Sequence, residues 1–139
     1  EIRQQLGDQD RTSVPLRERI AATLHSIGTV YHHLSRYPEA LVSLNQALVM
    51  RRQLGDSAAV GRTLNEIAVV YDIQSQYLKA LEFYQEALEI AQQEKDSVNI
   101  NAILSNMGLV YSQLGQYEKT IDFYGQVLEN NRKHSAISY

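Results

Sequence analysis

The chain has 139 residues, 44% of them hydrophobic and 21% charged, which suits one globular domain and argues against disorder. Thirteen Lys and Arg against sixteen Asp and Glu give a net charge of −3. This balance argues against a nucleic-acid partner, because nucleic-acid binders carry a basic surface. The absence of cysteine excludes disulfides, thiolate metal sites and cysteine nucleophiles. No apolar run is long enough to span a membrane, so we predict a cytoplasmic protein without a membrane partner.

The first part of the chain resembles the end of a helix that occurs again later. The run Arg3–Asp8 is nearly repeated at Arg51–Asp56, where it ends a long helical pattern. We therefore expect residues 1–20 to be the tail of a preceding repeat plus an extended connector, within a piece of a longer protein. Pro15 and the residues after it suggest that the next helix starts early.

An internal repeat organises the rest of the chain. Residues 21–60, 61–100 and 101–139 align without a gap at a period of 40. Five columns are identical in all three repeats: Leu24/Leu64/Leu104, Val30/Val70/Val110, Tyr31/Tyr71/Tyr111, Tyr37/Tyr77/Tyr117 and Leu48/Leu88/Leu128. Each repeat is one structural element of an array.

Each repeat contains two stretches with helical periodicity. In the first repeat, the apolar stripe of the first helix is Leu24, Ile27, Tyr31 and Leu34, and that of the second is Tyr37, Leu41, Leu44 and Leu48. A polar break at Ser35–Arg36 separates the two stripes, and Pro38 suits the first turn of the second helix. Gly55 and Asp56 are typical of a helix end followed by a new N-cap.

Small residues recur where two helices of a pair must approach closely, for example Gly28, Ala40 and Ala47. The tyrosines have helical spacing, so we expect them in the core and not in a platform that stacks nucleic-acid bases. The last repeat departs from the pattern at Thr120, Gly125 and Val127, and we predict that it packs more loosely.

These residues resemble the tetratricopeptide repeats. The family pattern is present as Leu24, Ile27–Gly28, Tyr31, Tyr37, Ala40, Leu44 and Ala47, and twice more along the chain. The repeat is similar to the longer, 40-residue type found in large bacterial multi-repeat proteins and Leu-Gly-Asn-type scaffolds. The resemblance implies an all-α fold, a right-handed superhelical solenoid of antiparallel helix pairs.

The resemblance also implies a concave groove lined by the first helix of each repeat. Carried onto this sequence, the partner-binding positions are Ala22, His25, Thr29, His32 and His33, then Arg62, Asn65, Val69, Asp72 and Ile73, then Ala102, Ser105, Leu109, Ser112 and Gln113. Such a mixture of polar and apolar side chains suits a peptide or a helix. The carboxylate clamp of chaperone adaptors is not matched, because only Asn65 is of its residue types.

No enzymatic signature is present, so we predict that the chain is not an enzyme and binds no cofactor. His25, His32 and His33 lack the three- or four-residue steps of a helical metal site, and adjacent His32 and His33 point about 100° apart. We expect polar groove residues there, with a pH-sensitive contact as the alternative.

The predicted function is a scaffold that binds a protein or peptide in the groove. One alternative is a self-assembly module, in which Ile137 and Tyr139 dock on the open end of a neighbour in a homo-oligomer. Another is a regulatory arm of a multidomain signalling protein or enzyme.

Overall fold

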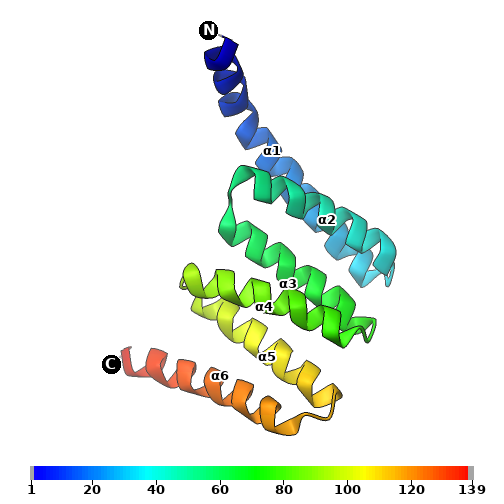
Figure 1. Cartoon of the computed structure of the whole chain (residues 1–139), viewed down its shortest axis with the longest axis vertical. Helices are drawn as coiled ribbons and strands as arrows, with labels where there is room; N and C mark the ends of the chain where they lie inside the picture. Colours follow the sequence, from blue (N-terminus) through cyan, green and yellow to red (C-terminus); the bar gives the residue numbers. More distant parts are fainter. Residues whose placement is uncertain (1, 138–139) are drawn as a thin grey trace. The chain divides into compact units, whose positions relative to one another are not determined.

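A computed structural model describes the backbone of residues 2–137 and the side chains of residues 13–135. Within this range the chain is all-helical, and Figure 1 shows the helices following one another through short turns. The helices are α1 (Ile2–His33), α2 (Tyr37–Leu54), α3 (Ser57–Ile73), α4 (Tyr77–Gln93), α5 (Ser97–Gln113) and α6 (Tyr117–Ile137). The predicted helix pairs are therefore confirmed as α1–α2, α3–α4 and α5–α6.

The turn inside each helix pair has the same geometry in all three repeats. Ser35, Ser75 and Gly115 take left-handed backbone conformations with φ of 59°, 60° and 75°. In the first turn, the Ser35 amide donates to the His32 carbonyl and the Arg36 amide to the Tyr31 carbonyl, both at 2.9 Å. These bonds satisfy carbonyl groups at the end of the helix and fix the reversal of the chain.

The turn between the first two pairs matches the sequence prediction. Gly55 has φ of 70°, and its amide donates to the Arg52 carbonyl at 3.1 Å. The Asp56 carboxylate accepts the Ala59 amide at 3.1 Å and so caps α3. Pro38 lies in the first turn of α2, as expected. Lys95 holds the place of Gly55 in the next repeat with φ of 55°, a conformation that costs a residue with a Cβ some stability.

Helix α1 differs from the expectation for the start of the chain. Its helical backbone runs without a break from Ile2 to His33 and includes Pro15. The expected connector is therefore helical. The Arg17 guanidinium donates to the Gln53 side-chain oxygen at 2.8 Å, which joins this early part of α1 to the end of α2.

The chain divides into two compact units, residues 1–63 and residues 64–139, and the boundary falls inside α3. In the first unit, α1 packs on α2 around buried Ala21, Ala40, Leu44 and Ala47. A Cβ on Gly28 would lie 2.6 Å from Leu44 Cγ, so only glycine permits this approach. The predicted role of a small residue at Gly28 is confirmed.

The second unit contains the larger core. Leu64, Ile67, Tyr84, Met107 and Val110 are buried there. Two equivalent aromatic stacks flank this core: the Tyr71 and Phe83 rings have centroids 5.5 Å apart, and the Tyr111 and Phe123 rings have centroids 5.3 Å apart. The aromatic pairs add to the apolar contacts that hold each first helix on its partner.

Part of the predicted core is wrong. Ile27 and Val30 of α1 are exposed, and so is Leu128 of α6, although residues at equivalent positions are buried. Leu34, which directly follows α1, is exposed too. Tyr117 and Tyr124 are exposed as well, so the tyrosines are not all core residues. The physical reason is that each of these faces lacks a neighbouring helix among the described residues.

The second helix of the last repeat has more exposed positions than α4, and the looser packing of this repeat stays a prediction. Its Thr120 is nevertheless buried, and the Thr120 hydroxyl donates to the Gly108 carbonyl at 3.0 Å. A polar side chain is tolerated at this otherwise small position because the hydrogen bond satisfies the hydroxyl. Gly125 has open space around the position of a Cβ.

Candidate functional site

His25 of α1 belongs to a polar cluster that joins three helices of the first unit. One Arg51 guanidinium nitrogen, Nη1, donates to Thr63 Oγ1 at 2.7 Å and lies 3.0 Å from His25 Nδ1. Because arginine has no acceptor, His25 Nδ1 is the acceptor of that bond. The Thr63 hydroxyl donates to the Ala59 carbonyl at 2.9 Å. His25 is half-buried, and the hydrogen bond from Arg51 holds its ring in place.

Positive charge gathers at this cluster. Burial lowers the pKa of the Arg51 guanidinium, the charge of nearby Arg62 lowers it further, and Asp56 acts in the opposite direction. The hydrogen-bond partners of Arg51 are neutral groups. Arg62 is exposed at the surface. An acidic group brought to this place would be attracted by both guanidinium groups.

The other predicted residues of α1 have local contacts. The Thr29 hydroxyl donates to the His25 carbonyl at 3.1 Å. The rings of His32 and His33 are stacked, with centroids 5.3 Å apart and planes inclined by 13°. The expectation that the two imidazoles point well apart is therefore wrong, because their side chains bend toward each other at the end of the helix.

Asp72 and Asn65 of α3 are less accessible than the sequence suggested. The Tyr84 hydroxyl donates to Asp72 Oδ2 at 3.3 Å, and burial raises the pKa of the Asp72 carboxyl. Asn65 Oδ1 is buried without a hydrogen-bond donor. The positions equivalent to Arg51 and Thr63 are Ala91 and Ile103, which offer no donor. Asn65 therefore holds the repeat position of His25, but the second repeat has no counterparts of the polar side chains that contact His25.

Apolar side chains are exposed on the first helices of the second unit. Ile73 of α3 and Leu109 of α5 are exposed, whereas Val69 is half-buried. Around Leu109, Ser105 and Ser112 are half-buried. Ala102 and Gln113 are exposed. Polar and apolar groups therefore alternate along α5 outside its core face.

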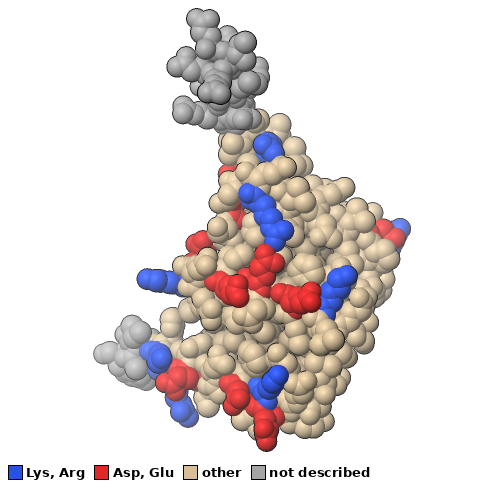
Figure 2. Space-filling model, in the orientation of Figure 1, with Lys and Arg blue, Asp and Glu red and all other residues tan. Residues whose placement is uncertain are grey.

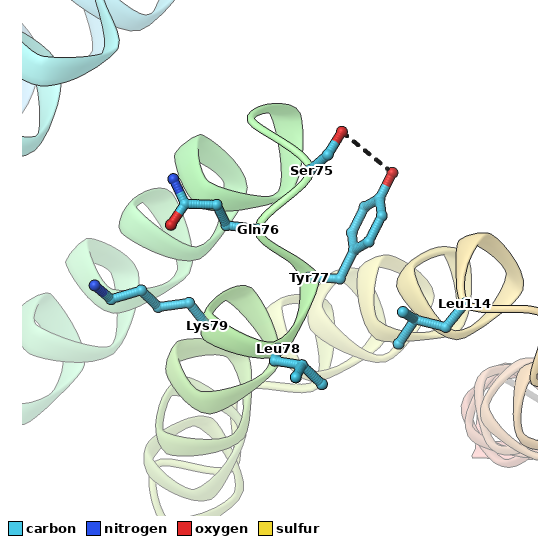
Figure 3. Close-up of a pocket in the computed structure, with 6 residues that line it drawn as sticks. All are labelled: Ser75, Gln76, Tyr77, Leu78, Lys79 and Leu114. Carbon is cyan, nitrogen blue, oxygen red and sulfur yellow. Dashed lines mark hydrogen bonds between the residues drawn. The ribbon is translucent and has the colours of Figure 1, made fainter.

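A shallow cavity of about 410 Å³ lies at the turn between α3 and α4, and Figure 3 shows the residues that line it. The Tyr77 hydroxyl points to Ser75 Oγ at 3.5 Å. Leu78 lies toward Leu114, the residue that follows α5. A similar depression follows the turn between α5 and α6, over residues 115–119. Because the cavity recurs with the turn, it is a consequence of the repeat geometry.

Other kinds of site find no support in the described part of the chain. No group of three or more His, Asp or Glu side chains there could hold a metal ion. Among the described helices, none is both long and apolar enough to cross a membrane. Figure 2 shows acidic and basic side chains interspersed on the face it presents.

Sequence reasoning missed Arg51 and Thr63, because both lie outside the positions implied by the resemblance. A signal was present: an arginine stands where the other repeats have Ala91 and Asn131. In the last repeat the side-chain oxygen Oδ1 of the equivalent Asn131 accepts a hydrogen bond from Asn101 Nδ2 at 3.1 Å. The position therefore joins neighbouring helices by polar contacts in two of the three repeats.

Repeated helix pairs with equivalent turns define an all-α helical-repeat solenoid, a class of protein that presents helix faces to its partners. The chain belongs to the tetratricopeptide repeat family. One family model for this repeat matches residues 19–93, and a second matches residues 102–134. Domains of this family generally mediate protein–protein interaction and are typically non-enzymatic scaffolds. No curated protein matches the chain in sequence.

Solved structures share the fold at low sequence identity. BtubC (BKLC) from P. vanneervenii matches with a TM-score of 0.80 and 19% identity over 94% of this chain and 55% of its own. The TPR domain of Arabidopsis FLU matches with a TM-score of 0.77 and 17% identity, over 84% of this chain and 98% of its own. Aspartyl phosphate phosphatase F from Bacillus subtilis matches with a TM-score of 0.80 and 18% identity, over 86% of this chain and 31% of its own. The chain thus spans about half of BtubC and less than a third of the phosphatase, and these likenesses show the fold alone.

Proposed function

We propose that the chain binds an extended or helical segment of a partner protein on the faces of its first helices. The observation that supports this most directly is the exposure of Ile73 on α3 and Leu109 on α5, outside the core. Exposed apolar side chains beside hydrogen-bonding groups are typical of surfaces that take up peptides or helices. Burial of these two side chains supplies affinity, and the serines beside Leu109 fix the position of the ligand.

The first unit, taken by itself, favours acidic ligands. Arg51 is half-buried and bound to neutral acceptors, and Arg62 is exposed beside it. A carboxylate of the ligand gains charge-assisted hydrogen bonds there without competing with an ion pair of Arg51. Binding is then weaker at high salt, because the Arg62 part of the contact is open to solvent.

Selection of a displayed peptide library on the wild-type chain, followed by titration of the selected peptides, tests the proposal. We expect Ile73→Glu with Leu109→Glu to weaken binding about tenfold or more, equivalent to about 1.4 kcal/mol. Leu78→Glu with Val98→Glu is the matched control, since both residues are exposed outside the predicted face and the charge change is the same. Equal losses in both variants would contradict the assignment of the face.

A second variant tests the polar residues predicted on α3. Arg62→Glu with Asn65→Ala is expected to abolish capture of the selected peptides while helicity by circular dichroism stays at the wild-type level. The substitution at Asn65 removes a buried acceptor without a donor, so no folding defect is expected there. Unchanged capture would show that the ligand binds elsewhere.

A further inference from the structure

Helix α1 has an apolar face that its own pair partner does not cover. Ile20, Ile27 and Val30 are exposed on it, and Thr23 lies between them at helical spacing. A cavity of about 400 Å³ lies over Thr23, Ile27, Val30 and their neighbours, and a second of about 290 Å³ continues along α1 beside Ile20. The face is therefore continuous over several turns of the helix.

The equivalent face of α5 is buried inside the second unit. Ile27 is 41% exposed and its counterpart Met107 is 2% exposed, while Val30 is 57% exposed and Val110 is fully buried. Helix α5 has its pair partner α6 just as α1 has α2, so the pair partner does not explain the difference. Helix α4 also packs against α5 and provides the additional cover.

Helix α6 presents the complementary face. Leu128 is 52% exposed whereas its counterpart Leu88 on α4 is 6% exposed, and Tyr124 is exposed whereas Tyr84 is buried. Ile121 extends this exposed stripe toward the start of α6. On α4, Tyr84 is bonded to Asp72 of α3, and the helix also packs against α5. Helix α6 has no such additional neighbour among the described residues.

We infer that α6 of one copy docks on α1 of a second copy in the manner in which α4 packs on α5. The occupant is a second copy because this one chain carries both halves of an interface that it already forms internally. The apolar residues that define the two faces, Ile27 and Val30 on one and Tyr124 and Leu128 on the other, hold the same repeat positions as the buried α5 and α4 residues.

The two faces differ, so the contact is heterologous and runs head to tail. Such contacts either close into a ring or continue as an open filament. The residues first expected to dock at this end, Ile137 and Tyr139, lie outside the residues whose side chains the structure describes. The inference rests on α6 residues 121–128 in their place. It concerns the exposed faces of α1 and α6 and does not depend on the proposed peptide-binding face.

Analytical ultracentrifugation of the wild-type chain over a wide range of concentration is the first test. The average mass should rise above the 15.8 kDa of one chain as the concentration increases. Ile27→Glu with Val30→Glu on α1, or Ile121→Glu with Leu128→Glu on α6, should each give a monomer. Leu78→Glu with Val98→Glu is the control with the same charge change and should assemble like the wild type.

Mixing the two monomeric variants tests the head-to-tail arrangement itself. The α1 variant retains an intact α6 face, and the α6 variant retains an intact α1 face. An equimolar mixture should therefore form a 1:1 dimer, with twice the mass of one chain, and should grow no further. All these substitutions lie at exposed positions, and thermal unfolding by circular dichroism confirms that each variant is folded.

Three results would overturn the inference. The first is a wild type that remains monomeric at every concentration, which would leave other helices as the occupants of these faces. The second is assembly of either face variant by itself, which would indicate a contact between like faces. The third is a mixture of the two variants that remains monomeric although the wild type assembles.

Discussion

The Tyr84 hydroxyl of α4 donates a hydrogen bond to Asp72 Oδ2 of α3 at 3.3 Å, joining the two helices of the second pair beside the core. Tyr84 itself is buried, and burial raises its pKa, with the charges of Asp72 and Glu66 acting in the same direction. The phenol therefore keeps its proton and remains a donor. The bond places a carboxylate, one of the predicted groove residues, at the edge of the apolar core.

Removal of the hydroxyl in Tyr84→Phe should lower the free energy of unfolding by roughly 1–2 kcal/mol, because a buried hydrogen bond to a carboxylate is lost. Tyr77→Phe is the control, since its hydroxyl lies 3.5 Å from Ser75 at an exposed turn and should matter by less than about 0.5 kcal/mol. Urea unfolding of both variants measures the difference. Equal effects would show that the contact with Asp72 contributes nothing of its own.

Asp72→Asn should alter how stability depends on pH. Burial raises the Asp72 pKa above its ordinary value of 3.8, so between 3.8 and the raised value the folded chain binds more protons than the unfolded one. The contribution of Asp72 to stability therefore falls as pH rises through this window. Asparagine keeps an acceptor for Tyr84 without the charge.

We accordingly expect Asp72→Asn to be more stable than the wild type at neutral pH and equal to it below pH 3.8. Urea unfolding at a series of pH values gives the difference curve. A difference that is constant with pH would contradict the raised pKa.

The bond between Arg51 and Thr63 should appear as a coupling energy in a double-mutant cycle. Thr63→Val removes the acceptor 2.7 Å from Arg51 Nη1 with little change in shape, and we expect a loss of about 1–2 kcal/mol. Thr63→Val with Arg51→Ala should cost about 1 kcal/mol less than the sum of the single changes. Additive losses would show that the two side chains do not stabilise each other.

Two glycines should respond in opposite ways to alanine. Gly125→Ala should stabilise the chain by about 1 kcal/mol, because the position is in the middle of α6 and nothing lies near the added Cβ. Gly28→Ala should destabilise it by about 1–3 kcal/mol, because the new Cβ would overlap Leu44. Thermal unfolding compares them, and stabilisation by both would mean that α1 and α2 separate at no cost.

Lys95 in its left-handed conformation should be improved by glycine. Lys95→Gly relieves the crowding of the Cβ at φ of 55° and should raise the free energy of unfolding by up to about 1 kcal/mol. Glu94→Gly is the matched control, since Glu94 has φ of −80° and glycine there should destabilise the chain. The prediction fails if both variants lose stability in urea.

Much of the fold was predictable from the sequence because the information is local. The helical spacing of Leu64, Ile67 and Tyr71 places one face of α3, and Gly55 with Asp56 ends one helix and caps the next. Such signals depend on residues a few positions apart. The 40-residue period then repeats the same local solution, which is why the helix pairs could be assigned without coordinates.

The candidate site was predictable only as a set of positions. The resemblance indicated His25, Asn65 and Asp72, but it could not show that His25 contacts Arg51 from another helix or that Tyr84 holds Asp72. These contacts join residues 12 and 26 positions apart in the sequence. They depend on how helices pack, and so on side chains that periodicity does not describe.

By itself, the sequence determined the repeat, the two helices in each repeat and the turns between them, since backbone hydrogen bonding and helix periodicity act over short distances. Only the tertiary structure decided which equivalent side chains are buried. Val30 and Val110 are the same residue at the same repeat position, yet one is exposed and the other buried. The difference arises because burial depends on a neighbouring helix, which α5 has in α4 and which the same face of α1 lacks among the described residues.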